Sequence, residues 1–498
     1  AEQRRARSRG PAAKPGFRTL LHERLSEGSG ACGDKSNSPS EQPIDTPYGR
    51  KTAIHQTSCN FDMTCLEGDC PAFASVSVDP DAKVERREIP QIEPSDLPAP
   101  TAIVDPDAFT VRLSGIGGTG VITVSQIIGT AAMLDGFDVR GLDQTGLSQK
   151  AGPVTSDVRM SRNGPTSSNH ATVAGVDAFL AFDMLAAASD SHRDGGAAGR
   201  TVVVGSIDVV PTGSMIVHPD QLRYPEQEAL RQRLDDVSRP EDNRYLDAGA
   251  ITDGLFGSRT TANILMLGVA VQLGAVPVAP APVERAIELN GVAVAQNLLA
   301  FRYGRRWVLE PDAVEAIAGV HGPRIETVDQ LIARLAADLA DYQDGAYAQR
   351  FRERIDRVID AERSVDPTST RFTEAVARHL HKLMAYKDEY EVARLALLDE
   401  SQQRYRAVGG PDTQVTYHLH PPMLRAMGMS RKLKFGRTGA PAFKALRPMK
   451  RLRGTRLDPF GYDEVRRIER AMIPEYEAAV DTLLAGLGAD TIDDAVEI

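Results

Sequence analysis

The chain has 498 residues, of which 42% are hydrophobic and 25% charged, and its formal net charge is −10. This length exceeds what one hydrophobic core usually serves, so two or three domains are expected. The acidic balance argues against general nucleic-acid binding, and the lack of an apolar run of about 18 residues argues against a membrane span. Because the first residues contain no signal-type apolar stretch, we expect a cytoplasmic protein.

All four cysteines lie in the first 70 residues, within a segment predicted at 1–86 that is rich in Gly, Ser and Asp. They are Cys32, Cys59, Cys65 and Cys70. Clustered cysteines in such a chain point to metal or redox chemistry more than to disulfides. Zinc and a set of small buried thiols are alternatives. The gaps of 26, 5 and 4 residues and the Cys70-Pro71 step favour an iron–sulfur site.

A proline-rich linker, predicted at 87–108, leads into a region where strand and helix signals alternate. This alternation predicts a Rossmann-like α/β domain with a parallel sheet over residues 109–310. The expected strands are 109–113, 138–142, 178–182 and 201–204, and the expected helices are 121–134, 261–273 and 283–301.

The remaining residues, 311–498, are predicted to form a mostly helical domain. Thr327 and Gln330 fit a capping box at the start of one helix. Another amphipathic helix is expected to place one set of side chains in a core, namely Ile468, Met472, Tyr476, Val480, Leu483 and Leu487. His418 and His420 alternate on a strand-like stretch but have no third ligand in view, so we expect ordinary surface or core histidines.

A basic run from Arg431 to Arg456 holds ten Lys or Arg residues and no acidic residue, so the rest of the chain carries −20. Such a run could dock an acidic protein or a phosphate-bearing coenzyme by electrostatic steering. The alternative, which the sequence favours, is that it neutralises neighbouring helices of an acidic chain.

A glycine-rich turn, GIGGTG from Gly115 to Gly120, follows a predicted strand and opens a predicted helix, where backbone N–H groups can bind phosphate. A second polar turn, predicted from Asp143 to Arg162, would face it across a crevice at the strand ends. Asp143 keeps an NAD site open as an alternative, and a turn that binds nothing is another. The predicted binding residues are Gly115, Gly117, Gly118, Thr119, Gly120, Thr145, Gly146, Gln149 and Gly152.

The sequences GIGGTGVITVSQIIGTAAMLDG and DQTGLSQKAGPVTSDVRMS are similar to the gamma-type domain of the pyruvate and 2-ketoacid ferredoxin oxidoreductases, in particular the fused indolepyruvate type. Residues 284–306, 374–395 and 453–462 resemble further stretches of that fused family, in the same order. The resemblance therefore covers nearly the whole chain, which looks like the C-terminal part of such an enzyme.

The resemblance implies an enzyme that decarboxylates a keto acid on thiamine diphosphate with Mg, forms acyl-CoA from coenzyme A and passes electrons to ferredoxin. The chain contains no convincing thiamine motif and begins with Ala1 rather than Met. We therefore expect the thiamine site on missing upstream sequence or on another subunit, and the chain is not expected to be active alone. The expected partners are ferredoxin, the thiamine-binding part and other subunits of a homo- or hetero-oligomer, and no catalytic residue is assigned.

The resemblance also implies two cluster motifs, of which the first is degenerate. Ser26, Ser29 and Ser38 stand in three of its cysteine positions, and only Cys32 remains. The second motif, with Cys59, Cys65 and Cys70, is complete. Because serine binds iron poorly, we expect at most one 4Fe–4S cluster, held by the four cysteines. The alternative function is a nucleotide- or CoA-binding scaffold of the same architecture that has lost redox activity.

Overall fold

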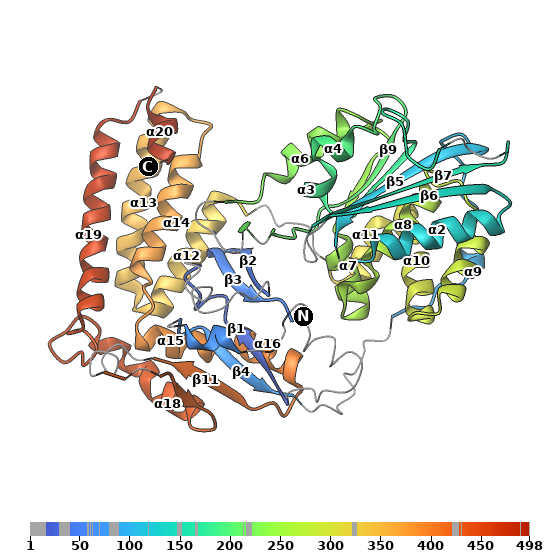
Figure 1. The fold of residues 1–498 in the computed structure, drawn as a ribbon. Coiled ribbons are helices and arrows are strands. Elements are labelled where there is room, and N and C mark those ends of the chain that lie inside the picture. The colour runs from blue at the N-terminus through green and yellow to red at the C-terminus, as the bar shows by residue number, and fades with distance from the viewer. Residues whose placement is uncertain are drawn as a thin grey trace. The chain divides into compact units, whose positions relative to one another are not determined.

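The computed structural model shows a chain that divides into two compact units (Figure 1). The helical unit comprises Ala1–Val84, Gly213–Leu222 and Ile325–Ile498, and the sheet unit comprises Glu85–Thr212 and Arg223–Arg324. The structure describes residues 16–28, 40–56, 59, 61, 63–68, 70–78, 89–117, 119–146, 152–164, 168–212, 214–215, 222–320, 326–420, 428–429, 431–488 and 490–497. Within these ranges, no helix is both long and apolar enough to cross a membrane.

The sheet unit is built on six strands in the order β10-β9-β8-β5-β7-β6. Their bounds are β5 Ala108–Ile116, β6 Asp138–Thr145, β7 Pro153–Ser161, β8 Ala178–Ala181, β9 Val202–Ser206 and β10 Arg244–Leu246. Strands β5, β8, β9 and β10 are parallel, whereas β7 runs antiparallel between β5 and β6. Strands β8 and β9 are buried throughout, as expected for parallel strands covered on both faces.

Helices cover both faces of this sheet (Figure 1). On one face lie α2 Val121–Leu134, α7 Ala248–Phe256, α8 Ala262–Leu273, α9 Pro280–Asn290, α10 Val294–Leu309 and α11 Pro311–Ala318, in one continuous core with the sheet. On the other lie α3 Met184–Ala187, α4 Asp190–Arg193 and α6 Gln227–Asp235, with a smaller core. The predicted Rossmann-like α/β fold is confirmed, with β7 as the antiparallel exception.

Two sequence predictions in the sheet unit are wrong. The helix expected over 283–301 is two helices, because Gly291 adopts a left-handed φ of 73° that ends α9. The polar turn expected from Asp143 to Arg162 contains β7, a central strand with most of its residues buried. The polar side chains of this segment are typical of a loop. In the structure they are accommodated in a strand because Thr155 and Asp157 bond to partners on one face of the sheet.

The helical unit combines helices with a four-stranded antiparallel sheet in the order β1-β4-β11-β12. The strands are β1 Phe17–Leu21, β4 Phe73–Ser77, β11 Val415–Leu419 and β12 Leu433–Phe435, beside the hairpin of β2 Glu41–Thr46 and β3 Gly49–Ile54. The helices are α12 Val328–Tyr342, α13 Gly345–Val365, α14 Arg371–Met384, α15 Glu389–Ala396, α16 Asp399–Gly409, α18 Gly439–Leu446, α19 Glu464–Ala485 and α20 Ile492–Glu497, with the 3-10 turns η1 Thr64–Glu67 and η4 Arg447–Leu452. Thr327 and Gln330 form the predicted capping box of α12.

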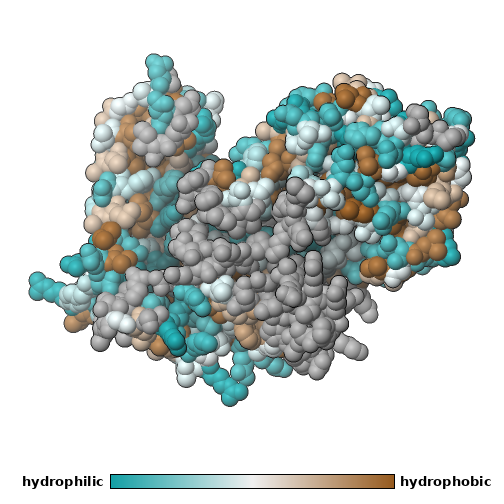
Figure 2. Space-filling model, in the orientation of Figure 1, coloured by the Kyte–Doolittle hydropathy of each residue, from teal (hydrophilic) through white to brown (hydrophobic). Residues whose placement is uncertain are grey.

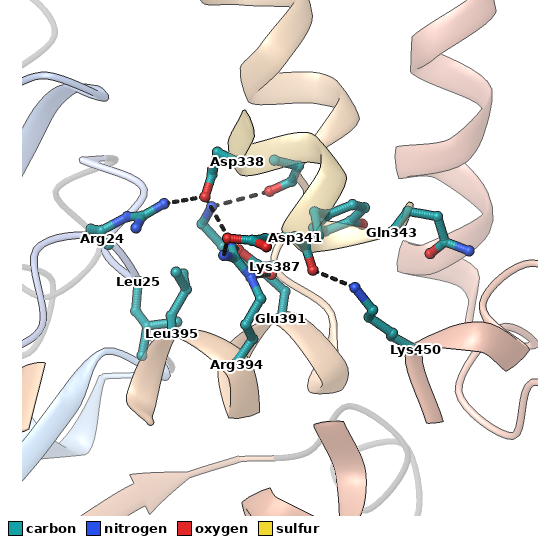
Figure 3. A network of polar contacts seen from close by, with 12 residues as sticks. Arg24, Leu25, Asp338, Asp341, Gln343, Lys387, Glu391, Arg394, Leu395 and Lys450 are labelled. Carbon is teal, nitrogen blue, oxygen red and sulfur yellow. Dashed lines mark hydrogen bonds and ion pairs between the residues drawn. The ribbon is translucent and has the colours of Figure 1, made fainter. Parts of the chain in front are cut away.

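The N-terminal segment, expected to stand apart as residues 1–86, shares this sheet with the C-terminal region. Strand β4 pairs with β1 on one side and with β11 on the other. A buried ion network adds a second connection, since Asp338 of α12 accepts hydrogen bonds from Arg24 and from Arg394 of α15 (Figure 3). The segment therefore folds as part of the helical unit. His418 of β11 is a core histidine, as expected, and bonds to Ser75 of β4 at 2.8 Å.

The predicted face of α19 is confirmed from Tyr476 onward, where all four of its residues lie in or against the core, and is wrong before that residue. Ile473 and Val480 are buried, whereas Ile468 is 53% exposed and Met472 is 43% exposed. The apolar residues of this helix lie on two faces, and the predicted stripe combined residues from both faces. The first half of α19 therefore presents apolar side chains to solvent.

Candidate functional site

The candidate site lies at the carboxyl ends of the parallel strands of the sheet unit. From β5 the chain runs through α2 to β6 on one side of the sheet, while β8 lies on the other side of β5. Open α/β sheets bind ligands at such a reversal of strand order, beside the carboxyl ends of the strands. The glycine-rich turn that follows β5 occupies this position.

The glycines of this turn are required by its geometry. A Cβ on Gly115 would lie 2.8 Å from Cγ2 of Val121 and 3.3 Å from Cβ of Phe182, so a side chain does not fit. Gly120 is the N-cap of α2 and has a φ of +94°, where other residues are strained, and a Cβ there would meet open space. Because glycine has no side chain with which to cap α2, its first N–H groups remain suited to an anion.

The turn and the second loop meet along one edge of the sheet. Gly115 and Thr145 both stand opposite Val154, one from each side of β7. The amide of Gly117 donates to the carbonyl of Gly152 at 2.8 Å. Two further hydrogen bonds fix the edge, from Gly146 N–H to the Pro153 carbonyl at 3.2 Å and from the Asn263 amide to the Thr119 carbonyl at 3.0 Å.

Seven of the nine predicted binding residues are thus brought to one edge: Gly115, Gly117, Thr119, Gly120, Thr145, Gly146 and Gly152. Gly118 and Gln149 lie outside the described residues. The two loops do not follow adjacent strands as expected, because β7 separates β5 from β6. They reach the same edge because β5 and β6 are parallel to each other.

The NAD alternative finds little support in the position of Asp143. Its Oδ1 atom accepts hydrogen bonds from the hydroxyls of Ser156 at 2.6 Å and Ser125 at 3.4 Å. A ribose-binding acid stands at the end of the strand next to the glycine turn, whereas Asp143 is on β6, two strands from β5. Asp143 therefore joins α2, β6 and β7 rather than facing a ribose beside the turn.

Two acids that the sequence analysis missed follow β8 and β9. Asp183 is 3% exposed, and its Oδ1 accepts from the Ala186 amide at 2.7 Å. Its Oδ2 is buried without a hydrogen-bond partner among the described residues. Burial, and then the charge of Asp208, raise the pKa of Asp183 to about 6. Burial also raises the pKa of Asp208, although Arg259 pairs with it at 2.7 Å. An Asp directly after each buried apolar run was the available signal.

A polar network under α4 was also missed. The imidazole of His192 bridges two strands, with Nδ1 2.7 Å from the Ser114 hydroxyl and Nε2 3.0 Å from the Thr155 hydroxyl. Burial and then Arg112 lower the pKa of His192, so the ring is neutral at neutral pH. Arg112 in turn forms a bidentate ion pair with Asp157. Because Ser114 is fully buried, this network holds α4 on the sheet.

The cysteines of the helical unit share one hydrophobic cluster. Cys65 is buried in it, and Cys59 and Cys70 pack against it. Burial raises the pKa of the Cys70 thiol. Cys32, Ser29 and Ser38 lie outside the described residues, and in the part that the structure describes no three His, Cys, Asp or Glu side chains are arranged to hold one metal ion. The hydroxyl of Ser26 accepts hydrogen bonds from two backbone amides, of Gly28 and Thr52, at 3.2 Å each.

Comparison with known proteins separates the same two regions of the chain. Residues 110–307 match the family described as pyruvate ferredoxin/flavodoxin oxidoreductase, and residues 328–498 match a family of unknown function (DUF6537). The indolepyruvate oxidoreductase subunit IorB of Methanothermobacter thermautotrophicus is 27% identical over 201 residues, which are 39% of this chain and 95% of that subunit.

Three solved structures resemble the chain. A pyruvate oxidoreductase subunit of Thermotoga maritima is 18% identical, with a TM-score of 0.30, over 40% of this chain and 96% of that one. A keto/oxoacid ferredoxin oxidoreductase gamma subunit of Geobacter sulfurreducens is 23% identical, with a TM-score of 0.29, over 40% of this chain and 98% of that one. The 2-oxoglutarate:ferredoxin oxidoreductase of Magnetococcus marinus is 19% identical, with a TM-score of 0.31, over 41% of this chain and 31% of that one. By its family match, this chain carries at residues 110–307 a domain of the pyruvate ferredoxin/flavodoxin oxidoreductase family.

Proposed function

We propose that the chain is the part of an indolepyruvate-type 2-oxoacid ferredoxin oxidoreductase that binds coenzyme A, while the keto acid is decarboxylated elsewhere in the enzyme. The family match over residues 110–307 supports a component of a keto acid oxidoreductase. The relative from Methanothermobacter thermautotrophicus, an indolepyruvate oxidoreductase subunit, supports the substrate class. The observation that carries the proposal is the glycine turn of this domain, which stands at the reversal of strand order with an uncapped helix behind it.

In this proposal, the residues of the sheet unit act by binding and positioning. The backbone amides at the start of α2 would hold a phosphate of coenzyme A, because Gly120 leaves open the space that a side chain would otherwise occupy. Thiamine diphosphate with Mg, on upstream sequence or another subunit, would supply the decarboxylation. Ferredoxin would accept the electrons.

The proposal is tested by titrating coenzyme A into the full chain and into Gly120→Val. Valine at a φ of +94° strains the turn, so we expect affinity for coenzyme A to fall about tenfold or more. The matched control is Gly199→Val, since Gly199 also has a positive φ, of +73°, and open space around it but lies away from the turn. Both variants should lose similar stability, and the control should keep its affinity. If the unmutated chain binds neither coenzyme A nor adenine nucleotides, the turn is only structural.

For the cysteine segment we propose one 4Fe–4S cluster held by Cys32, Cys59, Cys65 and Cys70. Cys65 lies in one hydrophobic cluster and Cys59 and Cys70 pack against it, which supports a shared site, although these side chains are not arranged to hold one metal ion in the described structure. Anaerobic reconstitution is expected to give about four iron and four sulfide per chain. Cys65→Ala should abolish the cluster absorbance near 400 nm, and Ser26→Ala should preserve it.

Other iron contents would decide against this cluster. About eight iron atoms per chain would contradict a single cluster, because two four-iron clusters would then be present. Stoichiometric zinc in place of iron would establish the zinc alternative. A chain that binds coenzyme A yet takes up neither metal would match the second candidate, a CoA-binding scaffold without redox activity. The hydroxyl of Ser26 already accepts two backbone hydrogen bonds, which argues against Ser26 as an iron ligand.

A further inference from the structure

The basic run of the helical unit is only partly used inside the fold. Arg453 forms an ion pair with Asp388, as internal neutralisation predicts, and Lys450 donates to the backbone carbonyl of Asp341 at 2.6 Å. Seven other basic side chains are exposed and have no ion-pair partner among the described residues. They are Arg431, Lys434, Arg437, Lys444, Arg447, Arg451 and Arg456. Internal neutralisation therefore explains a minority of the run.

An exposed apolar stripe follows directly in the chain. Its members are Leu457 (76% exposed), Tyr462 (68%), Val465 (40%), Ile468 (53%) and Met472 (43%). Those on α19 are spaced three and four residues apart and share one face of the helix. The Tyr462 hydroxyl donates to the Arg456 carbonyl at 2.7 Å, which joins the stripe to the basic run. Figure 2 shows hydrophobic residues at the surface on the lower left, where Figure 1 draws the first half of α19.

We propose that the basic run and this stripe together form the docking surface for an acidic electron-carrier protein of the ferredoxin or flavodoxin kind. The inference rests on the proposed function, which supplies the need for an acceptor. An apolar centre bordered by charges is the usual make-up of a protein interface, and apolar patches left uncovered mark such sites. The rest of the chain carries −20, so an acidic partner would be repelled elsewhere and steered here.

Two other occupants fit this surface less well. Single-stranded nucleic acid is bound by aromatic platforms on which bases stack, whereas four of the five stripe residues are aliphatic. An anionic membrane attracts continuous basic faces, but Glu464 and Glu475 are exposed on the same helix as the stripe. A folded partner can place complementary groups opposite both signs of charge.

The test is calorimetric titration of the full chain with a purified acidic ferredoxin and with a flavodoxin, at about 50 mM and about 500 mM salt. The first variant combines Arg437→Glu, Arg447→Glu and Arg451→Glu. We expect it to weaken binding about tenfold or more at low salt, with a smaller difference at high salt. The second combines Ile468→Gln and Met472→Gln and should weaken binding several-fold at both salts, since apolar burial is not screened.

Matched controls separate this surface from general electrostatics. Arg352→Glu, Arg363→Glu and Arg406→Glu reverse three exposed arginines outside the surface, and Leu289→Gln removes an exposed leucine of the sheet unit. These controls should leave carrier affinity within about twofold of the unmutated chain. Equal losses in the arginine variants and their control, or no loss in either surface variant, would overturn the proposal. Binding to phosphatidylserine vesicles or to single-stranded DNA that depends on the surface, without carrier binding, would overturn it as well.

Failure of the proposed function would look different. In that case the reconstituted enzyme would reduce no artificial acceptor such as methyl viologen when given keto acid and coenzyme A. A different result would be an enzyme that reduces methyl viologen normally and transfers electrons to the carrier equally well with and without the surface substitutions. That result would support the proposed function and contradict the proposed docking surface.

Discussion

Replacing Asp338 with alanine is expected to lower the free energy of unfolding of the helical unit by about 3–5 kcal/mol. Asp338 is 8% exposed and has three partners, of which Figure 3 shows Arg24 and Arg394. Its Oδ1 accepts from Arg24 at 2.5 Å and from Arg394 at 2.8 Å, and its Oδ2 bonds to Nε2 of His381 at 3.1 Å. Removing the carboxylate leaves buried cations without their counter-charge, although Glu391 still pairs with Arg394.

The matched control for this variant is Asp341→Ala on the same helix. The Asp341 side chain is 78% exposed and lies 4.0 Å from Arg394, so its loss should change stability by no more than about 0.5 kcal/mol. The measurement is calorimetric unfolding of the full chain for both variants under the same conditions. Equal shifts for the two variants would show that the buried network is not a stabilising connection.

The same network predicts a pH dependence. Burial alone would raise the pKa of Asp338, but the hydrogen bond from His381 and the charges of Arg394 and Arg24 outweigh it and hold the pKa well below its ordinary value of 3.8. The folded state therefore binds fewer protons than the unfolded state below about pH 4. The stabilisation is present at neutral pH and is lost as the pH falls, so Asp338→Ala should flatten the acid limb of a plot of stability against pH.

The second large effect is expected from Gly304→Ala in the sheet unit. Helices α8 and α10 approach so closely that a Cβ on Gly304 would lie 1.9 Å from the Leu265 carbonyl oxygen. A Cβ on Gly268, across the same contact, would lie 2.1 Å from the Phe301 carbonyl oxygen. Backbone cannot move aside as a side-chain tip can, so the two helices must separate. We expect the free energy of unfolding to fall by about 3 kcal/mol, which is at the upper end of the usual range for an overpacked core.

Gly129→Ala on α2 is the control for this variant. A Cβ there would make one ordinary contact, at 3.6 Å from Cγ1 of Val139. Alanine has the higher helix propensity, so this variant should be neutral or more stable by up to about 1 kcal/mol. Urea unfolding of both variants at one temperature provides the comparison. A Gly304→Ala protein as stable as the control would mean that the α8–α10 contact is looser than the structure shows.

The sequence predicted those features whose signals are local. Helix α2 was predicted with its observed bounds, because the glycine turn marks its start and an apolar run fills its length. The capping box of Thr327 was predicted because its two residues stand three apart. Strand β7 was missed because Thr155 and Asp157 serve the network of His192, which is distant in the sequence.

Features that join distant segments left no local signal. Val76 pairs with Val415, and Arg24 pairs with Asp338, and nothing near either position indicates its partner. The environment of Asp183 was missed for the same reason, since its raised pKa depends on burial and on Asp208, which follows a different strand. The exposed face of α19 was misjudged because apolar periodicity shows that a helix has a face but not what covers it.

The pairing of β4 with both β1 and β11 has a consequence for synthesis. The sheet unit lies between these strands in the chain, so during translation it is complete before the strands that finish the helical unit have emerged. Until then β1 and β4 form a two-stranded ribbon whose open edge invites wrong pairing. Early folding of the sheet unit would make the chain between β4 and β11 compact and so lower the entropy cost of the loop that β11 must close. The edge of β4 that β11 covers, in the cysteine-bearing segment, therefore has no partner strand until residues 415–419 have been made.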